Sequence, residues 1–371
     1  MDAKIIIGAN LGDEGKGTIV AKYAKQSAMQ SKKVINVLTN GGSQRSHSIL
    51  TENGESFTFK HFGSGTYHGA GNYFSKHFIL NPMQFVKEYN DLVSRGVLLH
   101  GIFRNYDCMW TTPFDMMANQ IIEEIRGSSK HGSCGMGIWE TIQRYNNSLT
   151  ITLDGFNNFN NDVKRLHLKH IKDYHEKRIT IPDKWKDVWN SDNLIDNFIE
   201  DCKFMVYNTS VVYSDNEAIC NSIYDEVIFE NGQGLMLSDT GKDIPGTTPS
   251  ITDSSYAMNI IRNLSAEVDV YLHYVTRPYL TRHGNGYLHK ESIRSDVSKY
   301  IESDRTNVYN EFQGSFRYAP LDLTSLKDRI VSDAGNNDFV LEVTHCDEMD
   351  RVDEFKKHFI NVNTYDDALI K

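Results

Sequence analysis

Short apolar runs alternate with segments of helical periodicity along the chain. Four to eight consecutive apolar residues between polar turns are typical of strands that are covered on both faces. The predicted strands are Lys4–Gly8, Lys33–Leu38, Gly96–Leu99, Glu226–Glu230, Val268–Val275 and Phe339–Val343, and the predicted helices between them include Gly15–Gln26, Pro82–Arg95 and Met116–Arg126. This alternation predicts an α/β fold, a mainly parallel central sheet with surrounding helices, whose site lies at the carboxyl ends of the strands.

The middle of the chain has a different pattern. Leu166–Tyr207 is rich in Lys, Asp, His and Trp at helical spacing, so a peripheral helical region is predicted at about 156–207, starting with an Asn/Phe-rich surface insertion at 156–162. Its histidines His167, His170 and His175 are expected to be solvated helix residues, because no carboxylate repeats at metal-ligand spacing. No linker or internal repeat divides the chain, which favours one domain over residues 1–371.

Composition narrows the classes of partner. The net charge of −10 argues against a general nucleic-acid surface, which needs clustered Lys and Arg. The five cysteines form no CxxC pair, and no apolar run approaches the roughly 18 residues of a membrane span. With no basic-then-apolar leader either, we expect a soluble cytoplasmic protein with reduced cysteines, and neither nucleic acid nor membrane as a partner.

The first predicted strand leads into a glycine-rich turn that contains Asp13, Glu14 and Lys16. A turn between a strand and a helix exposes backbone N–H groups that attract anions, and the two carboxylates oppose this attraction. Carboxylates in such a place indicate metal binding or proton chemistry on a bound nucleotide. The ordinary P-loop is excluded, because Asn10 stands where its glycine is needed and Gly17 where its hydroxyl is needed. A tight structural turn is the alternative interpretation.

Gly12–Gly17 reads GDEGKG and resembles the signature of adenylosuccinate synthetases, which join L-aspartate to the 6-position of a purine nucleotide with GTP and Mg²⁺. The resemblance implies that Asp13 removes the purine N1 proton and contacts the metal, with Ser46 as a second ligand, and that Lys16 holds phosphate. It also assigns nucleotide and phosphate binding to Gly12, Glu14, Gly15, Gly17, Thr18 and Ser48.

Further segments resemble motifs of the same family, in the same order. Asn40–Ser48 is similar to GGHNAGHT, whose second histidine acts on the transferring phosphate and the purine oxygen and matches His47. A base at N1 and a donor for the charge that develops on O6 are the two groups that this reaction needs. Substrate contacts are implied for Gln44, Ser133, Cys134, Thr248 and Thr276, a catalytic purine contact for Gln233, and a supporting role in its turn for Glu230. Tyr279–Gly286 matches a motif with valine at the position of His283, and Asp347 matches the residue that reads guanine.

Arg144 matches the arginine that family members extend across a dimer interface to the substrate phosphate. The resemblance therefore implies a homodimer in which Arg144 crosses to the partner. A solvated helix arginine is the equally weighted alternative.

Three departures from the family bear on the substrates. The aspartate-binding loop is shortened to Glu311–Asp322 with one arginine, Arg317, as the candidate for the aspartate carboxylate. Gln44 and Arg45 replace Asn and Ala, and His345 replaces a lysine over the guanine, although Asp347 still favours GTP over ATP as the donor. These changes resemble the viral and archaeal side of the family.

Viral members of that branch aspartylate dGMP to make a precursor of 2-aminoadenine for DNA, and several have a smaller residue where this chain keeps Asp13. We therefore predict dGMP as the acceptor, with IMP as the alternative, and a host-cytoplasmic location if the protein is viral. A regulatory nucleotide-binding protein that has lost catalysis is the alternative from another class.

Overall fold

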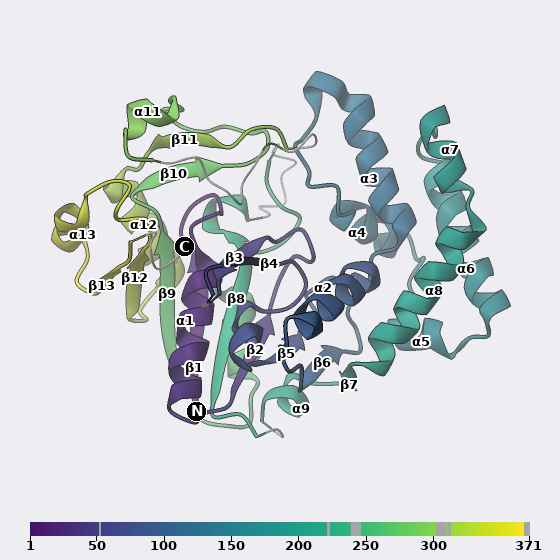
Figure 1. The fold of residues 1–371 in the computed structure, drawn as a ribbon, viewed down its shortest axis with the longest axis horizontal. Helices are drawn as coiled ribbons and strands as arrows, with labels where there is room; N and C mark the ends of the chain where they lie inside the picture. The colour runs from purple at the N-terminus through teal and green to yellow at the C-terminus, as the bar shows by residue number, and fades with distance from the viewer. Residues whose placement is uncertain (52, 221–222, 239–245, 302–308, 310–312, 367–371) are drawn as a thin grey trace.

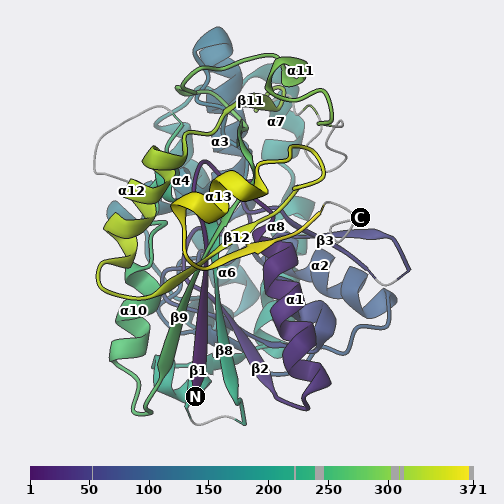
Figure 2. The same ribbon diagram turned by 90° about the vertical axis from the view of Figure 1, so that its left-hand side faces the viewer.

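The computed structural model describes residues 1–51, 53–220, 223–238, 246–301, 309 and 313–366. Within these residues, nine strands form one sheet in the order β13-β12-β9-β1-β8-β2-β5-β6-β7, and every pairing between neighbours is parallel. Helices surround this sheet (Figure 1, Figure 2). The predicted α/β architecture with a mainly parallel central sheet is confirmed.

The strands of the large sheet are β1 (Asp2–Gly8), β2 (Val34–Leu38), β5 (Gly71–Phe74), β6 (Ile102–Asn105), β7 (Ser210–Val212), β8 (Glu226–Gly234), β9 (Asp269–Thr276), β12 (Phe339–Val343) and β13 (Val362–Thr364). Two antiparallel hairpins are made by β3 (His47–Leu50) with β4 (Ser56–Phe59) and by β10 (Tyr279–Arg282) with β11 (Arg317–Pro320). Each hairpin begins shortly after a strand of the large sheet, β2 or β9, and so lies near the carboxyl ends of the strands.

The helices are α1 (Lys16–Met29), α2 (Pro82–Ser94), α3 (Pro113–Arg126), α4 (Ile138–Asn146), α5 (Leu153–Asn158), α6 (Asn161–Glu176), α7 (Asp183–Trp189), α8 (Asp192–Tyr207), α9 (Asp215–Ile219), α10 (Ser255–Arg262), α11 (Arg294–Val297), α12 (Leu323–Ala334) and α13 (Val352–His358). No helix in the described ranges is both long and apolar enough to cross a membrane.

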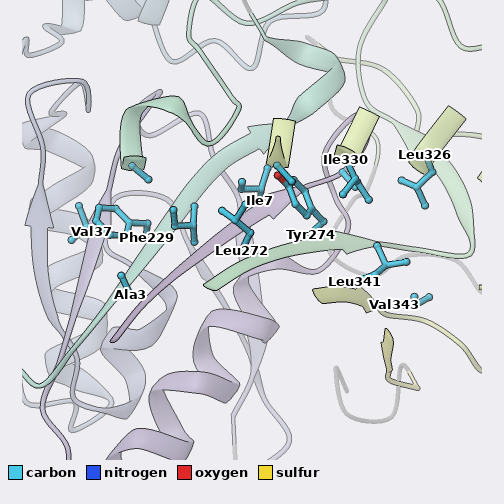
Figure 3. Close-up of a cluster of buried hydrophobic side chains, with 14 of the residues drawn as sticks. Ala3, Ile7, Val37, Phe229, Leu272, Tyr274, Leu326, Ile330, Leu341 and Val343 are labelled. Atoms are coloured by element: carbon cyan, nitrogen blue, oxygen red, sulfur yellow. The ribbon is translucent and has the colours of Figure 1, made fainter. Parts of the chain in front are cut away.

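The central strand β1 is covered on both faces. Ile5 and Ile7 belong to the apolar cluster that includes Leu326 and Ile330 of α12, whereas Ile6 packs in the cluster that includes Ile19 of α1. Figure 3 shows the first cluster, with β1, β8, β9 and β12 contributing side chains beneath α12. Successive strand residues point to opposite faces, so a continuous apolar run is what two covered faces require.

Two of the sequence-based predictions for local structure are wrong. Gly96–Leu99 is not a strand: Val97 N–H caps α2 through Leu92 O, Leu98 is 83% exposed, and the strand follows at Ile102–Asn105. The predicted turn at Asn231–Gly234 is the end of β8, which pairs with β1 as far as Gly234. Phe156–Asp162 spans the end of α5 and the start of α6, and although Phe156 is fully buried, residues 158–162 are exposed, as expected of a surface segment.

The region at 156–207 is helical, as predicted, but it contributes to a second core. Side chains of α6 and α8 pack with those of α2 and α3, and the α5–α8 group lies at the end of the molecule where β6 and β7 form the sheet edge (Figure 1). The residues of this core from the region include Leu168, Ile171, Trp189, Ile195, Phe198 and Met205. His170 is solvent-exposed as expected, whereas His175 is buried, which contradicts its interpretation as a solvated residue.

Candidate active site

Five segments with candidate chemistry follow five adjacent strands. The order β12-β9-β1-β8-β2 brings together the segments that begin after Val343, Thr276, Gly8 and Leu38, and the end of β8 itself at Asn231–Gly234. Because all these strands are parallel, their carboxyl ends meet at one edge. Residues as distant in sequence as Lys16 and Asp347 are therefore placed at the same edge of the sheet.

The glycine turn after β1 is organised by Glu14. Its carboxylate is 2% exposed and accepts hydrogen bonds from the backbone N–H groups of Asn10 (3.0 Å) and Gly12 (2.8 Å), and it pairs with Lys16 Nζ at 2.9 Å. A Cβ on Gly8 would lie 2.4 Å from Glu14 Oε2, so only glycine fits there. In this structure Glu14 thus occupies the inside of the turn. Phosphate can bind the N–H group of Gly12 and Nζ of Lys16 only if the Glu14 carboxylate first releases both groups.

Asp13 differs from Glu14 because its carboxylate is only partly buried. It is 20% exposed, its backbone has the left-handed φ of 59°, and its carbonyl accepts a hydrogen bond from Arg277 Nε at 2.6 Å. Burial raises the pKa of Asp13, and the positive groups nearby, His283 first and then Arg277 and Lys16, only oppose this rise. A carboxylate with a raised pKa in a strained turn is well suited to accept a proton.

His47 begins β3 and is held by Glu230 of β8. The Nδ1 atom of His47 lies 2.6 Å from Glu230 Oε1, and the same carboxylate accepts hydrogen bonds from Arg45 Nη2 (2.7 Å), Ser64 Oγ (2.6 Å) and Ser64 N (2.8 Å). Burial opposes ionisation of Glu230, but Arg45 and His47 outweigh burial and lower its pKa to about 2. The carboxylate is therefore charged, and Nδ1 of His47 donates to it.

The remaining nitrogen of His47 is left unused. Nε2 is buried without a hydrogen-bond partner in the described part of the chain, and burial, with Arg45 as the next cause, lowers the pKa of His47 to about 4. His47 is thus neutral near pH 7. Gly17 lies against it, since a Cβ at Gly17 would approach His47 Cβ to 2.9 Å, so the turn and the histidine share one site.

The candidate purine contact Gln233 lies beside the segment that follows β2. Asn40 Nδ2 donates to Gln233 Oε1 at 3.3 Å, and a Cβ on Gly41 would lie 3.1 Å from the Gln233 amide. Gln44 Nε2 donates to Thr248 Oγ1 at 2.9 Å. Gln44, Thr248 and Gln233 are therefore neighbours, as one substrate pocket requires. Pro245 of the Thr248 motif lies outside the described residues.

On the other side of the turn, β9 and β12 supply two threonines. Thr276 Oγ1 accepts a hydrogen bond from Asn10 Nδ2 at 2.9 Å, and Thr344 Oγ1 donates to Glu14 O at 2.8 Å. Asp347, three residues after Thr344, is exposed. The segment expected to read guanine thus begins in direct contact with the glycine turn. Thr18 and Ser48 also meet, through Thr18 Oγ1 and Ser48 O at 3.5 Å, and Ser46 is exposed at the same loop.

The turn expected to hold the substrate 5′-phosphate is closed by a carboxylate. Glu123 of α3 accepts hydrogen bonds from the backbone N–H groups of His131, Gly132 and Ser133, and Ser133 Oγ donates to Asn119 at 2.7 Å. Cys134 is partly buried, and burial raises the pKa of its thiol. Sequence reasoning missed Glu123, because an acidic residue on a helix carries no signal that it will cap a turn eight to ten residues later.

Arg144 is buried, so its interpretation as a solvated helix arginine is wrong, whereas its contact across a dimer interface stays a prediction. Its guanidinium is fully buried, pairs with Asp115 at 3.0 Å and donates to the carbonyls of Trp110 and Leu149. His175 Nε2 lies 2.9 Å from the same Asp115. Since Asp115, Arg144 and His175 come from α3, α4 and α6, the arginine here joins three helices of its own chain.

In this structure Arg317 pairs with Glu291, and its assignment to the aspartate carboxylate stays a prediction. Its guanidinium contacts both carboxylate oxygens of Glu291, with Nε at 2.9 Å, and donates to the carbonyls of Gly284 (2.9 Å) and Gly286 (3.0 Å). These contacts hold the loop after β10. Glu311 and Phe312 of the same motif lie outside the described residues.

The described residues fit a magnesium ion that is bound mainly through its substrates. No three His, Cys, Asp or Glu side chains among them gather into a metal-binding cluster. Mg²⁺ is usually held by one or two carboxylates and by substrate phosphates, so the partly exposed Asp13 carboxylate is the appropriate donor. The second proposed ligand, Ser46, is exposed in the loop before β3.

Comparisons with known proteins indicate which family this chain belongs to. The family model described as "Adenylosuccinate synthetase" matches residues 5–359. The adenylosuccinate synthetase of Malacoplasma penetrans is 25% identical over 367 residues, covering 95% of this chain and 79% of that protein. The match to the Dehalococcoides mccartyi enzyme (strain CBDB1) is 29% identical but limited to 139 residues, 31% of that protein.

Two solved structures share the fold. One is fully ligated adenylosuccinate synthetase from Plasmodium falciparum, with a TM-score of 0.68, 20% identity, and coverage of 93% of this chain and 77% of that one. The other is the succinoaminodeoxyadenylate synthetase PurZ of cyanophage S-2L, bound to dGMP and dATP, with a TM-score of 0.60, 13% identity, and coverage of 98% and 91%. Given the model match over nearly its whole length, the chain belongs to the adenylosuccinate synthetase family of carbon–nitrogen ligases.

Proposed function

We propose that this protein joins L-aspartate to the 6-position of a purine nucleoside monophosphate, through a 6-phosphoryl intermediate, with dGMP as the acceptor. The observation that carries the proposal is Asp13: a partly exposed carboxylate with a raised pKa, in the same turn as Lys16 and as Gly17, which lies against His47. A carboxylate opposes phosphate binding in such a turn, so it indicates metal binding or proton removal, and the raised pKa of Asp13 suits the second role.

The chemistry follows from a poor leaving group. The 6-oxygen of a purine cannot be displaced directly, so Asp13 removes the N1 proton and O6 attacks the γ-phosphorus of the nucleoside triphosphate, releasing the diphosphate. The amine of aspartate then attacks C6, and O6 leaves as part of inorganic phosphate. Adenylosuccinate synthetases use GTP and Mg²⁺, and the ion offsets charge on the phosphoryl oxygens.

Lys16 and His47 serve the phosphoryl group in this scheme. Lys16 exchanges Glu14 for a phosphoryl oxygen, which is a charge-assisted contact of the same kind. His47 accepts at Nε2 while it is neutral, and the incoming negative charge favours its protonated form, which donates to the developing oxyanion. Glu230 holds the ring in position through Nδ1 in both states.

Two observations favour dGMP over IMP. PurZ of cyanophage S-2L, which has the same fold, is bound to dGMP, and this chain has one arginine in the loop where the family motif has several. A lost arginine near the ribose suits a deoxyribose. IMP remains the second candidate, because the matching curated relatives are adenylosuccinate synthetases and because Asp13 is kept.

The phosphate donor is proposed to be GTP. Asp347 is exposed at the segment that contacts the glycine turn through Thr344, where its carboxylate can accept from N1 and N2 of guanine. The dATP in the PurZ structure makes ATP or dATP the alternative.

The deciding experiment supplies aspartate, Mg²⁺ and one of dGMP, IMP or GMP, paired with GTP or ATP, and follows phosphate release and the succino-purine by mass. We expect dGMP with GTP to give the highest kcat/KM. A preference for IMP would mean that the protein is an ordinary adenylosuccinate synthetase. Nucleotide binding without phosphate release in every pair would support a regulatory protein instead.

A further inference from the structure

His283 lies beside Asp13, the proposed base, and the proposed mechanism assigns it no role. It follows β10, and its Nδ1 lies 3.9 Å from Asp13 Oδ2. The matching family motif has valine at this position, so the imidazole is a feature of this chain. Phe316 packs against the ring with centroids 4.7 Å apart, and Phe316 in turn lies 5.7 Å from the guanidinium of Arg277, which holds the Asp13 backbone.

The second nitrogen of His283 lacks a partner. Nε2 is buried and makes no hydrogen bond within the part of the chain that the structure describes. A neutral imidazole has one N–H, and a carboxylate beside Nδ1 favours the tautomer that carries it there. Nε2 is then an unsatisfied acceptor, and a ligand that donates to it recovers the cost of leaving it unpaired.

The sheet order places His283 on a defined side of Asp13. Strand β1, which leads to Asp13, lies between β9 on one side and β8 and then β2 on the other. His283 follows β9 and β10, whereas His47 follows β2, and the β10–β11 and β3–β4 hairpins are separate in Figure 1. The two histidines therefore follow strands on opposite sides of β1, the strand that leads to Asp13.

The two neighbours of N1 in a purine are likewise on opposite sides of this atom. Its 6-oxygen is on one side of N1, and C2 with its substituent is on the other. If N1 faces Asp13 and O6 faces His47, the C2 substituent faces His283. In guanine that substituent is an amino group, a hydrogen-bond donor, whereas hypoxanthine has only C–H there.

We infer that His283 is the residue that selects a 2-amino-6-oxopurine: Nδ1 faces Asp13, and Nε2 accepts a hydrogen bond from the 2-amino group of the acceptor nucleotide. The inference rests on the proposed function, because it takes N1 to be the atom that Asp13 contacts. It deepens that function by naming the group that distinguishes dGMP from an IMP-like acceptor. The valine of the family motif has no hydrogen-bond acceptor, so only the histidine can accept from the 2-amino group in this way.

The test compares dGMP with dIMP, which differ only in the 2-amino group. For the wild type and for His283→Val, calorimetry gives the Kd of each nucleotide, and phosphate release gives each kcat/KM with aspartate, GTP and Mg²⁺. The wild type should prefer dGMP, and His283→Val should reduce the dGMP-to-dIMP ratio roughly tenfold to a hundredfold, the size of one lost hydrogen bond to a buried partner.

Conservative variants and a control complete the design. His283→Gln, whose amide oxygen can replace the Nε2 acceptor, should recover more of the dGMP preference than His283→Asn, which is shorter. His289→Val changes an exposed histidine on the same loop and should leave the ratio unaltered. Melting temperatures of all variants show whether they are folded.

The outcomes separate the two proposals. If wild-type turnover is intact and His283→Val reduces affinity and kcat/KM for dGMP and dIMP by the same factor, the selection role is overturned while the ligase function stands. If the wild type binds and converts neither nucleotide, the proposed function fails and this inference with it. A wild type that converts dIMP as well as dGMP also overturns the selection role.

Discussion

At the scale of single residues, two neighbouring carboxylates of one turn have opposite environments. Glu14 is enclosed and accepts backbone N–H groups, whereas Asp13 is partly exposed and has a raised pKa. The turn therefore uses Glu14 to fix its shape and leaves Asp13 for chemistry. The sequence distinguished the two only through resemblance to a motif, because both are acidic residues between glycines.

Asp13→Asn tests this division. Asn tolerates the left-handed backbone at this position, so the turn should keep its shape, but an amide cannot take a proton. We expect kcat to fall roughly 10²- to 10⁴-fold while the nucleotide Kd changes little, with binding measured by calorimetry and turnover by phosphate release. Unimpaired turnover would remove the base assignment.

Arg45 is the second residue with a clear expectation. Its side chain is fully buried, it pairs with Glu230, and its Nε and Nη1 have no partner among the described residues. Arg45→Met leaves Glu230 as a buried charge without its strongest counter-ion, so the free energy of unfolding should fall by about 3–5 kcal/mol in urea titration.

The matched control for Arg45 is Arg165→Met. Arg165 forms an exposed ion pair with Asp196, with side chains 48% and 42% exposed, and such pairs contribute about 1 kcal/mol or less. Equal losses in the two variants would mean that the Arg45–Glu230 pair contributes no more than a surface pair.

At the scale of elements, the strands with continuous apolar runs were predictable and the helix contacts were not. β12 was predicted with its observed bounds, and β1, β2 and β9 within a few residues. Gly96–Leu99 was wrongly predicted as a strand, because its apolar residues follow the cap of a helix and do not enter the sheet. The burial of Arg144 and His175 was not predicted, because their common partner, Asp115, lies on another helix. Sequence spacing within one helix carries no information about such a partner.

Arg144→Met distinguishes an internal role from one across an interface. Because Asp115 would lose its buried guanidinium, we expect a loss of about 3–5 kcal/mol in the free energy of unfolding. The oligomeric state, followed by light scattering, should not change. A variant of normal stability with a large increase in KM for the nucleotide monophosphate would instead indicate an arginine that contacts phosphate.

At the scale of the whole molecule, the site is a consequence of sheet order. Five strands that are distant in sequence are adjacent in the sheet, and their carboxyl ends gather segments with carboxylates, amides, hydroxyls and a histidine. The sequence predicted that these segments would meet, because the strands were recognisable and parallel sheets concentrate chemistry at one edge. It did not predict Glu123 closing the phosphate turn or His283 facing Asp13, because both contacts depend on how separate segments fold over that edge.

Buried neutral histidines contribute to the pH dependence of the stability of the whole molecule. Burial lowers the pKa of His47 to about 4 and that of His61 to about 3, below the ordinary value of about 6.5. Between those values the unfolded chain binds protons at these two residues that the folded chain does not, so their contribution to stability falls as the pH falls from about 6.5. The buried carboxyls of Glu88 and Glu140 act in the opposite direction, because burial raises their pKa to about 7. Each of these histidines should cost about 2 kcal/mol at pH 5.

Urea unfolding at pH 7 and pH 5, compared between the wild type and His61→Phe, isolates the contribution of His61. His61 lies among Phe74, Phe78 and Phe85, so phenylalanine suits the cavity although Asn81 N–H loses its acceptor. The variant should be less stable at pH 7 but lose less on acidification. An unchanged difference between the two pH values would rule out His61 as a source.

The most direct measurement of the central claim follows one oxygen atom. With dGMP carrying ¹⁸O at O6, plus aspartate, GTP and Mg²⁺, a 6-phosphoryl intermediate transfers the label to inorganic phosphate. The account predicts that phosphate released by the wild type contains one ¹⁸O per turnover and that Asp13→Asn releases almost none. Unlabelled phosphate from the wild type would contradict it, because O6 would then never have attacked the nucleoside triphosphate.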